Sequence, residues 1–86
     1  MMTPTVHLNG TGRKRLVEDA SNVMRAIADA IDVARAAAPH GRDYYTQAAG
    51  AFERARREHT ARIERLEGVR REYQELALAI DHGAAS

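Results

Sequence analysis

The two halves of this chain each carry apolar residues at intervals of three and four, and one turn-rich block separates them. Such spacing keeps one seam of an α-helix facing a partner. The first seam comprises Leu16, Ala20, Val23, Ile27, Ala30, Ala34 and Ala37. The second seam comprises Phe52, Ala55, His59, Ile63, Leu66, Val69, Tyr73, Leu76 and Ile80. Together the seams predict an all-α chain that folds as an antiparallel two-helix hairpin.

The N-terminal residues have no helical periodicity, and Pro4 stands near their start. Residues 1–12 are therefore expected to form a short extended arm. The helical hairpin is expected to occupy the remaining residues, 13–86. Its first helix is predicted over about 13–38, because Pro39 disfavours a helical conformation in the residue before it.

The turn of the hairpin is predicted over residues 39–46, where Gly41 gives the backbone freedom to reverse. The second helix is predicted over about 47–82. Either Asp43 or Thr46 can serve as its N-cap, because both side chains accept hydrogen bonds from free backbone N–H groups.

A reversal at this turn also predicts the register of the two helices. Facing positions should sum to roughly 88, so that Leu16 faces Tyr73 and Met24 faces Leu66. The second helix is then longer than the first by about two turns, or about 10 Å. We expect the arm or a partner subunit to cover this overhang.

A second apolar stripe runs along the first predicted helix, one residue away from the seam. It comprises Val17, Met24, Ile31 and Ala38. The combined apolar arc is wider than the roughly 100° that one neighbouring helix covers. Because 86 residues folded as two helices also bury little surface, the pattern predicts a homo-oligomeric helical bundle. Val17, Met24 and Ile31 are the residues expected between subunits.

The charged residues argue against binding to duplex nucleic acid. Twelve of the thirteen basic residues are arginine, and Lys14 is the only lysine, yet the net charge is only +1. Arginine suits carboxylate and phosphate recognition, although a GC-rich genome produces the same bias without a function. Arginine and glutamate alternate through the second half, whereas a duplex binder more often carries a net positive charge.

Several other classes of protein are disfavoured by what the sequence lacks. It has no cysteine, so it offers no disulfide framework and no thiolate metal site. No apolar run approaches the roughly 20 residues of a membrane span, and the N-terminus does not read as a signal peptide. We expect a cytoplasmic protein that does not enter a membrane.

No residue pattern indicates a catalytic site, a metal site or a cofactor site. The four histidines, His7, His40, His59 and His82, show no metal-ligand spacing, so no metal site is predicted. No phosphate-binding loop or nucleophile motif is present, so we predict a protein that is not an enzyme, with no catalytic residue and no cofactor. His59 lies on the second seam and is interpreted as a core residue.

The turn gathers side chains suited to ligand recognition: His40, Arg42, Tyr44 and Tyr45, with Asp43 among them. Loops often carry recognition residues. Tyrosine supplies contact area at a small cost in rotamer entropy, and arginine can clamp a phosphate. The set suits a small anionic aromatic ligand. The alternative is structural: Arg42 and Asp43 tie the loop together, one tyrosine folds onto the helix ends, and the other packs on a neighbour.

A basic cluster opens the first predicted helix, formed by Arg13, Lys14 and Arg15. Positive charge at this end opposes the helix dipole, so the cluster favours the binding of an anion. The alternative is that these side chains are solvated or pair with Glu18 and Asp19. The cluster and the turn lie at opposite ends of one hairpin, so they can share a ligand only if a neighbouring subunit runs antiparallel.

Two strings of the chain resemble those of small helical proteins of bacteriophage and prophage genomes: His7-Leu8-Asn9-Gly10-Thr11 and Gly41-Arg42-Asp43-Tyr44-Tyr45. In size and hairpin architecture the chain is also similar to the phage sponge proteins that blunt CBASS and Thoeris immunity. Those helical-hairpin oligomers sequester cyclic nucleotide signals without cleaving them. The resemblance carries over no site residue, and it implies a protein that works in the host cell cytoplasm.

Three functions are compatible with this sequence. The first is a phage-type binding protein that captures a small phosphate-bearing, nucleotide-like ligand at a subunit junction, as an anti-defence sponge does. The second is a helical interaction module that inhibits a host defence protein. The third is a structural or assembly accessory protein without a ligand. All three are expected to act by binding.

Overall fold

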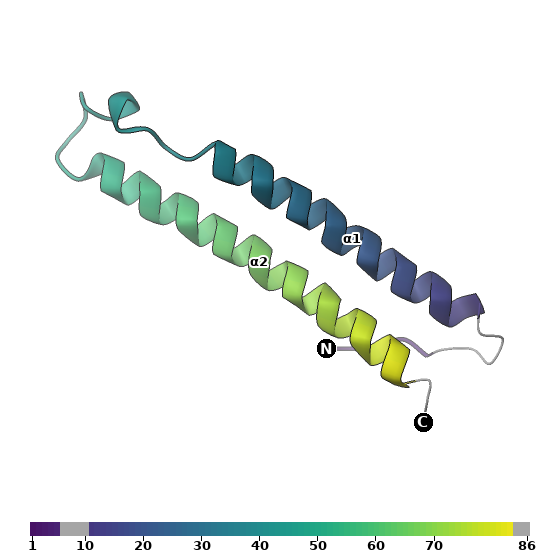
Figure 1. Cartoon of the computed structure of the whole chain (residues 1–86). Helices are drawn as coiled ribbons and strands as arrows, with labels where there is room; N and C mark the ends of the chain where they lie inside the picture. Colours follow the sequence, from purple (N-terminus) through teal and green to yellow (C-terminus); the bar gives the residue numbers. More distant parts are fainter. Residues whose placement is uncertain (6–10, 84–86) are drawn as a thin grey trace.

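The protein is an antiparallel pair of long α-helices. A computed structural model describes residues 1–5 and 11–83. Helix α1 spans Thr11–Ala36, a short 3-10 helix η1 spans Gly41–Asp43, and helix α2 spans Ala51–Gly83. Figure 1 shows α1 and α2 side by side along the length of a molecule that measures 62 × 19 × 12 Å. The predicted all-helical hairpin is confirmed, and the described residues contain no strand.

The N-terminal segment and helix α1 meet near the predicted boundary. Residues 1–5 are exposed and have no regular secondary structure, while residues 6–10 of the expected arm lie outside the described part of the chain. Helix α1 ends at Ala36, two residues before the predicted end. The Ala37 N–H still donates to the Ala34 carbonyl at 3.0 Å, so the last turn tightens before the chain reaches Pro39.

The reversal of the chain lies later than the sequence predicts. Gly41 does not make it, because among the described residues only Gly50 has a positive φ, of 87°. The Gly50 carbonyl accepts a hydrogen bond from the Arg54 N–H at 3.0 Å, so Gly50 takes the N-cap position of α2. Asp43 belongs to η1 instead, and α2 begins at Ala51 rather than near residue 47.

The segment before the reversal continues alongside the first turns of α2. The Tyr44 and Phe52 rings have centroids 6.2 Å apart, and a Cβ built on Gly41 would lie 3.8 Å from the Phe52 ring. Contact with Phe52 therefore carries residues 37–44 past the end of α1 before the chain turns. In Figure 1 the first turns of α2 extend beyond the last turn of α1.

This path shifts the register of the hairpin. Arg35 Nη2 lies 3.5 Å from Glu67 Oε1, and these positions sum to 102 (35 + 67). At the other end of the hairpin, Val17 and Asp81 line one pocket and sum to 98 (17 + 81). The predicted sum of roughly 88 is therefore wrong. The helices are displaced from the predicted register by at least ten residues, or at least about 15 Å, because the loop runs along α2 before it turns back.

The core of the hairpin is thin. The buried apolar side chains are Ala20, Ile31 and Ile80, with Ile31 at 3% exposure and Ile80 at 2%. Because Ile31 is already buried within one chain, it is not free to form the subunit contact that was predicted for it. Val17 and Met24 are half-buried and keep part of their surface open.

Candidate functional site at the hairpin tip

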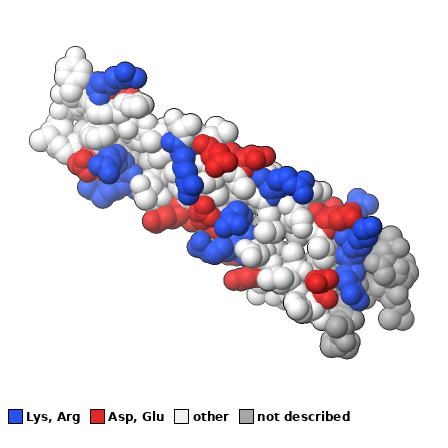
Figure 2. Space-filling model, in the orientation of Figure 1, with Lys and Arg blue, Asp and Glu red and all other residues white. Residues whose placement is uncertain are grey.

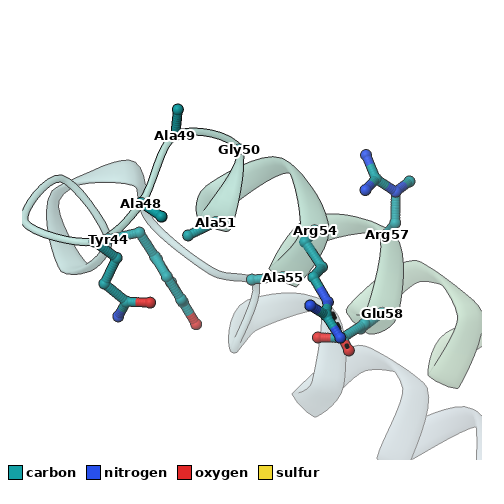
Figure 3. A pocket seen from close by; sticks show the side chains of 10 residues that line it. Tyr44, Ala48, Ala49, Gly50, Ala51, Arg54, Ala55, Arg57 and Glu58 are labelled. Carbon is teal, nitrogen blue, oxygen red and sulfur yellow. Dashed lines mark ion pairs between the residues drawn. The ribbon is translucent and has the colours of Figure 1, made fainter.

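A pocket of about 530 Å³ lies where the loop enters α2. Figure 3 shows Tyr44 and the loop on one side of it and the first turns of α2 on the other. The lining residues are Tyr44, Gln47, Ala48, Ala49, Gly50, Ala51, Arg54, Ala55, Arg57 and Glu58. Alanine and glycine contribute no polar side chains, so the polar side chains of the pocket come from Tyr44 and Gln47 of the loop and from α2.

Phe52 holds Tyr44 at this pocket. Its ring lies 6.2 Å from that of Tyr44, and the Arg56 guanidinium carbon lies 5.8 Å from its centre on another side. Arg56 is itself oriented by Glu53, whose carboxylate accepts a hydrogen bond at 3.3 Å. Aromatic and cation–π contacts of this kind each contribute about 0.5 to 1.5 kcal/mol. The aromatic wall of the pocket is thus built by packing between the loop and α2.

The two arginines of the pocket differ in their surroundings. Arg54 Nε lies 3.9 Å from Glu58 Oε2, and the dashed line in Figure 3 marks this pair. Arg57 makes no ion pair within the part of the chain that is described, and its side chain is exposed. A guanidinium that is not already paired can donate two parallel hydrogen bonds to a phosphate. Arg57 is therefore the better anion-binding group of the two.

The predicted tip residues divide between the pocket and the outer surface. Tyr44 is half-buried and lines the pocket. His40, Arg42 and Tyr45 are exposed and lie outside the lining, and Tyr45 is 80% exposed. None of these three makes an ion pair in the described chain. The contact between the Tyr44 and Phe52 rings is one that the structural interpretation of the loop also expects.

Sequence reasoning missed Gln47, Arg54 and Arg57 as lining residues. Arg54 and Arg57 looked like members of an evenly charged helix face. The signal that could have found them is Gly50, since a glycine directly before a helix marks the place where a loop folds onto its first turns. Residues of those turns, one helical turn apart, then face the loop.

A second pocket lies at the base of the hairpin, where α1 begins and α2 ends. Its volume is about 430 Å³, and it is lined by Arg13, Lys14, Val17, Glu18 and Asp81. Arg15 lies outside it and pairs with Asp19, its Nε 3.4 Å from Oδ1. Two members of the predicted basic cluster therefore share a pocket with two acids, while the third pairs on the surface.

Tip and base cannot serve one ligand within a single chain. They lie at opposite ends of a molecule 62 Å long. Figure 2 shows Lys and Arg interspersed with Asp and Glu along the face between them, which gives that face no continuous basic stripe. The visible charge pattern agrees with the alternation of arginine and glutamate in the sequence.

Neither a metal centre nor a membrane span emerges from the described residues. They contain no group of three or more His, Cys, Asp or Glu side chains placed to hold a metal ion. No helix among them is long and apolar enough to cross a membrane.

No known protein family, curated protein or solved structure shows significant similarity to this chain. The function is therefore inferred from the side chains of this chain and their positions. The site with the strongest chemical character is the tip pocket, a space of ligand size whose lining includes one tyrosine and two arginines.

Proposed function

We propose that this protein is a non-enzymatic binding protein that sequesters a small phosphate-bearing, nucleotide-like ligand at a junction between subunits. One observation carries the proposal: Tyr44, Arg54 and Arg57 border a single pocket of about 530 Å³. That volume falls within the roughly 300 to 1,000 Å³ typical of small-molecule sites.

The chemistry of the pocket fits the two parts of a nucleotide. A tyrosine ring offers a flat apolar surface on which a base can stack. Arginine binds phosphate through its planar, permanently charged fork. Sequestration without turnover is the activity that this set of residues supports.

The open side of the pocket supports a site completed by a second subunit. The lining comes entirely from the loop and one helix of one chain, so part of a bound ligand would stay uncovered. Small-molecule sites bury about 70 to 90% of a ligand of drug size. A neighbouring subunit that brings further basic residues over the opening would raise coverage to that range.

A role in phage defence evasion follows from the sequence resemblance. The strings around Asn9 and Asp43 resemble those of small phage and prophage proteins, and the hairpin is loosely similar in size and architecture to the nucleotide sponges. A phage-encoded sponge would act in the host cell cytoplasm by lowering the concentration of a nucleotide immune signal. This assignment depends on analogy of size and fold.

Calorimetric titration with cyclic and linear nucleotides tests the proposal, with inorganic phosphate and a nucleoside as partial ligands. We expect a nucleotide to bind, and Arg57→Ala to weaken it about ten- to a hundredfold, the effect of losing one charge-assisted contact. The matched control is Arg65→Ala, which removes another exposed arginine of α2 from outside the pocket. Absence of nucleotide binding, or equal losses in both variants, would overturn the proposal.

A second function, inhibition of a host defence protein, is favoured by the exposed tip. Tyr45 is 80% exposed beside the exposed Arg42. Tyrosine and arginine are enriched among residues that dominate protein interfaces. If this function holds, Tyr45→Ala should abolish inhibition of a purified defence complex while nucleotide titrations show no binding.

A further inference from the structure

The surface area of the hairpin is too large for a compact monomer. A compact protein of 9.5 kDa exposes about 5,000 Å², whereas this chain exposes 6584 Å². The excess is therefore about 1,500 Å². A stable protein interface hides about 800 Å² on each partner. The hairpin thus leaves open more surface than a second copy needs to cover.

One face of α1 offers apolar surface that α2 does not use. Four residues at spacings of four, three and four share an arc of about 60° and are all exposed. They are Ala26, Ala30 and Val33 of α1, and Ala37 in the tightened turn directly after it. Val33, at 71% exposure, is a β-branched apolar side chain placed among three small ones. The row lies about 120° around the helix from Ala20 and Ile31, which face α2.

Three charged residues beside this row lack partners of opposite charge. Arg25, Asp29 and Asp32 are exposed and form no ion pair among the residues that the structure describes. Arg25 donates only to the Asn22 amide oxygen, at 3.3 Å. By contrast, Arg15 pairs with Asp19, which lies four residues further along the same helix. The apolar row is therefore flanked by a base and two acids that are available to a neighbour.

We propose that a second copy of this chain packs antiparallel along this face of α1. Ala26 then lies against Ala30 of the partner subunit, so that facing positions sum to about 56. In the same register Arg25 approaches Asp29 and Asp32 of the partner subunit, and the two-fold axis repeats both contacts. Antiparallel packing of two hairpins gives a four-helix bundle that covers Val33.

This dimer would complete the ligand site of the proposed function, and the inference rests on that function. With facing positions that sum to about 56, Arg13–Arg15 of one copy lie beside residues 41–43 of the partner subunit. The basic cluster at the base is thereby brought to the tip of the other chain. It would supply positive charge on the open side of the pocket that contains Arg57. The subunit that completes the tip pocket is then a second copy of the same protein.

Light scattering without any nucleotide tests the assembly. We expect the wild type to form a dimer, or a multiple of one, and Val33→Glu to weaken it on the order of a hundredfold, because each dimer buries two unpaired charges. Val69→Glu is the control, since it places the same charge at another exposed valine, on α2. Circular dichroism of both variants checks that the helices remain. A monomeric wild type, or equal effects of both variants, overturns the proposal.

Cysteine cross-linking tests the antiparallel register, because the chain contains no cysteine of its own. Ala30→Cys lies about four residues, or about 6 Å along the axis, from its symmetry mate, so a short bifunctional thiol reagent should join the two subunits. Ala37→Cys lies about 27 Å from its mate and should not be joined. A cross-link in both variants would indicate a parallel pair and overturn the register. Nucleotide binding is not measured here, so the assembly can stand where the proposed function fails.

Discussion

Alanine substitutions at Gly68 and Gly50 should change stability in opposite directions. Gly68 lies in the middle of α2, where an added Cβ would meet nothing closer than Arg71 Nη2, at 3.9 Å. Gly68→Ala should therefore raise the free energy of unfolding by about 1 kcal/mol, the difference in helix propensity. An added Cβ at Gly50 also finds open space, but its φ of 87° is one that alanine rarely adopts. Gly50→Ala should cost about 1 to 2 kcal/mol.

Thermal unfolding at one fixed protein concentration measures the effect of both substitutions, because self-association makes the midpoint depend on concentration. In a domain of this size 1 kcal/mol corresponds to roughly 4 to 8 °C. We expect the Gly68 variant to melt higher than the wild type and the Gly50 variant lower. A Gly68 variant that melts lower and dissociates would refute the reasoning, since it would mean that a neighbouring helix packs against Gly68.

Two further substitutions test the core. Ile80→Ala should lower the free energy of unfolding by about 2 to 5 kcal/mol in urea titrations, while Leu78→Ala, at a residue 51% exposed, should change it by less than about 1 kcal/mol. Similar losses of stability in the two variants would mean that Ile80 is packed no better than Leu78. His59 Nε2 is buried without a hydrogen-bond partner in the described chain, so His59→Leu should leave stability unchanged or higher by about 1 kcal/mol. A loss greater than 1 kcal/mol in the same assay would indicate that the imidazole makes a bond that leucine cannot replace.

The sequence determined the two helices and their pairing, because helical periodicity is a local property. Residues three and four apart share one face of a helix wherever the helix is placed. The seam that contains Ile80 could therefore be found by counting along the chain, and Ile80 is buried. Ile31 is buried within one chain as well, although it lies in the stripe that was predicted to face another subunit. Pro39 likewise placed the end of α1 within two residues, since its effect reaches only its immediate neighbours.

The path of the loop was decided by tertiary contacts, and the register followed from it. Nothing in the spacing of residues indicates that Phe52 would hold Tyr44 and Gly41 beside α2. Nor does it indicate that the chain would reverse at Gly50. The contact with Phe52 joins segments with no shared periodicity, and it moves one helix at least about 15 Å along the other. It also creates the tip pocket and brings Arg57 to it. A local pattern specifies which face of a helix is apolar, but only packing decides what lies opposite.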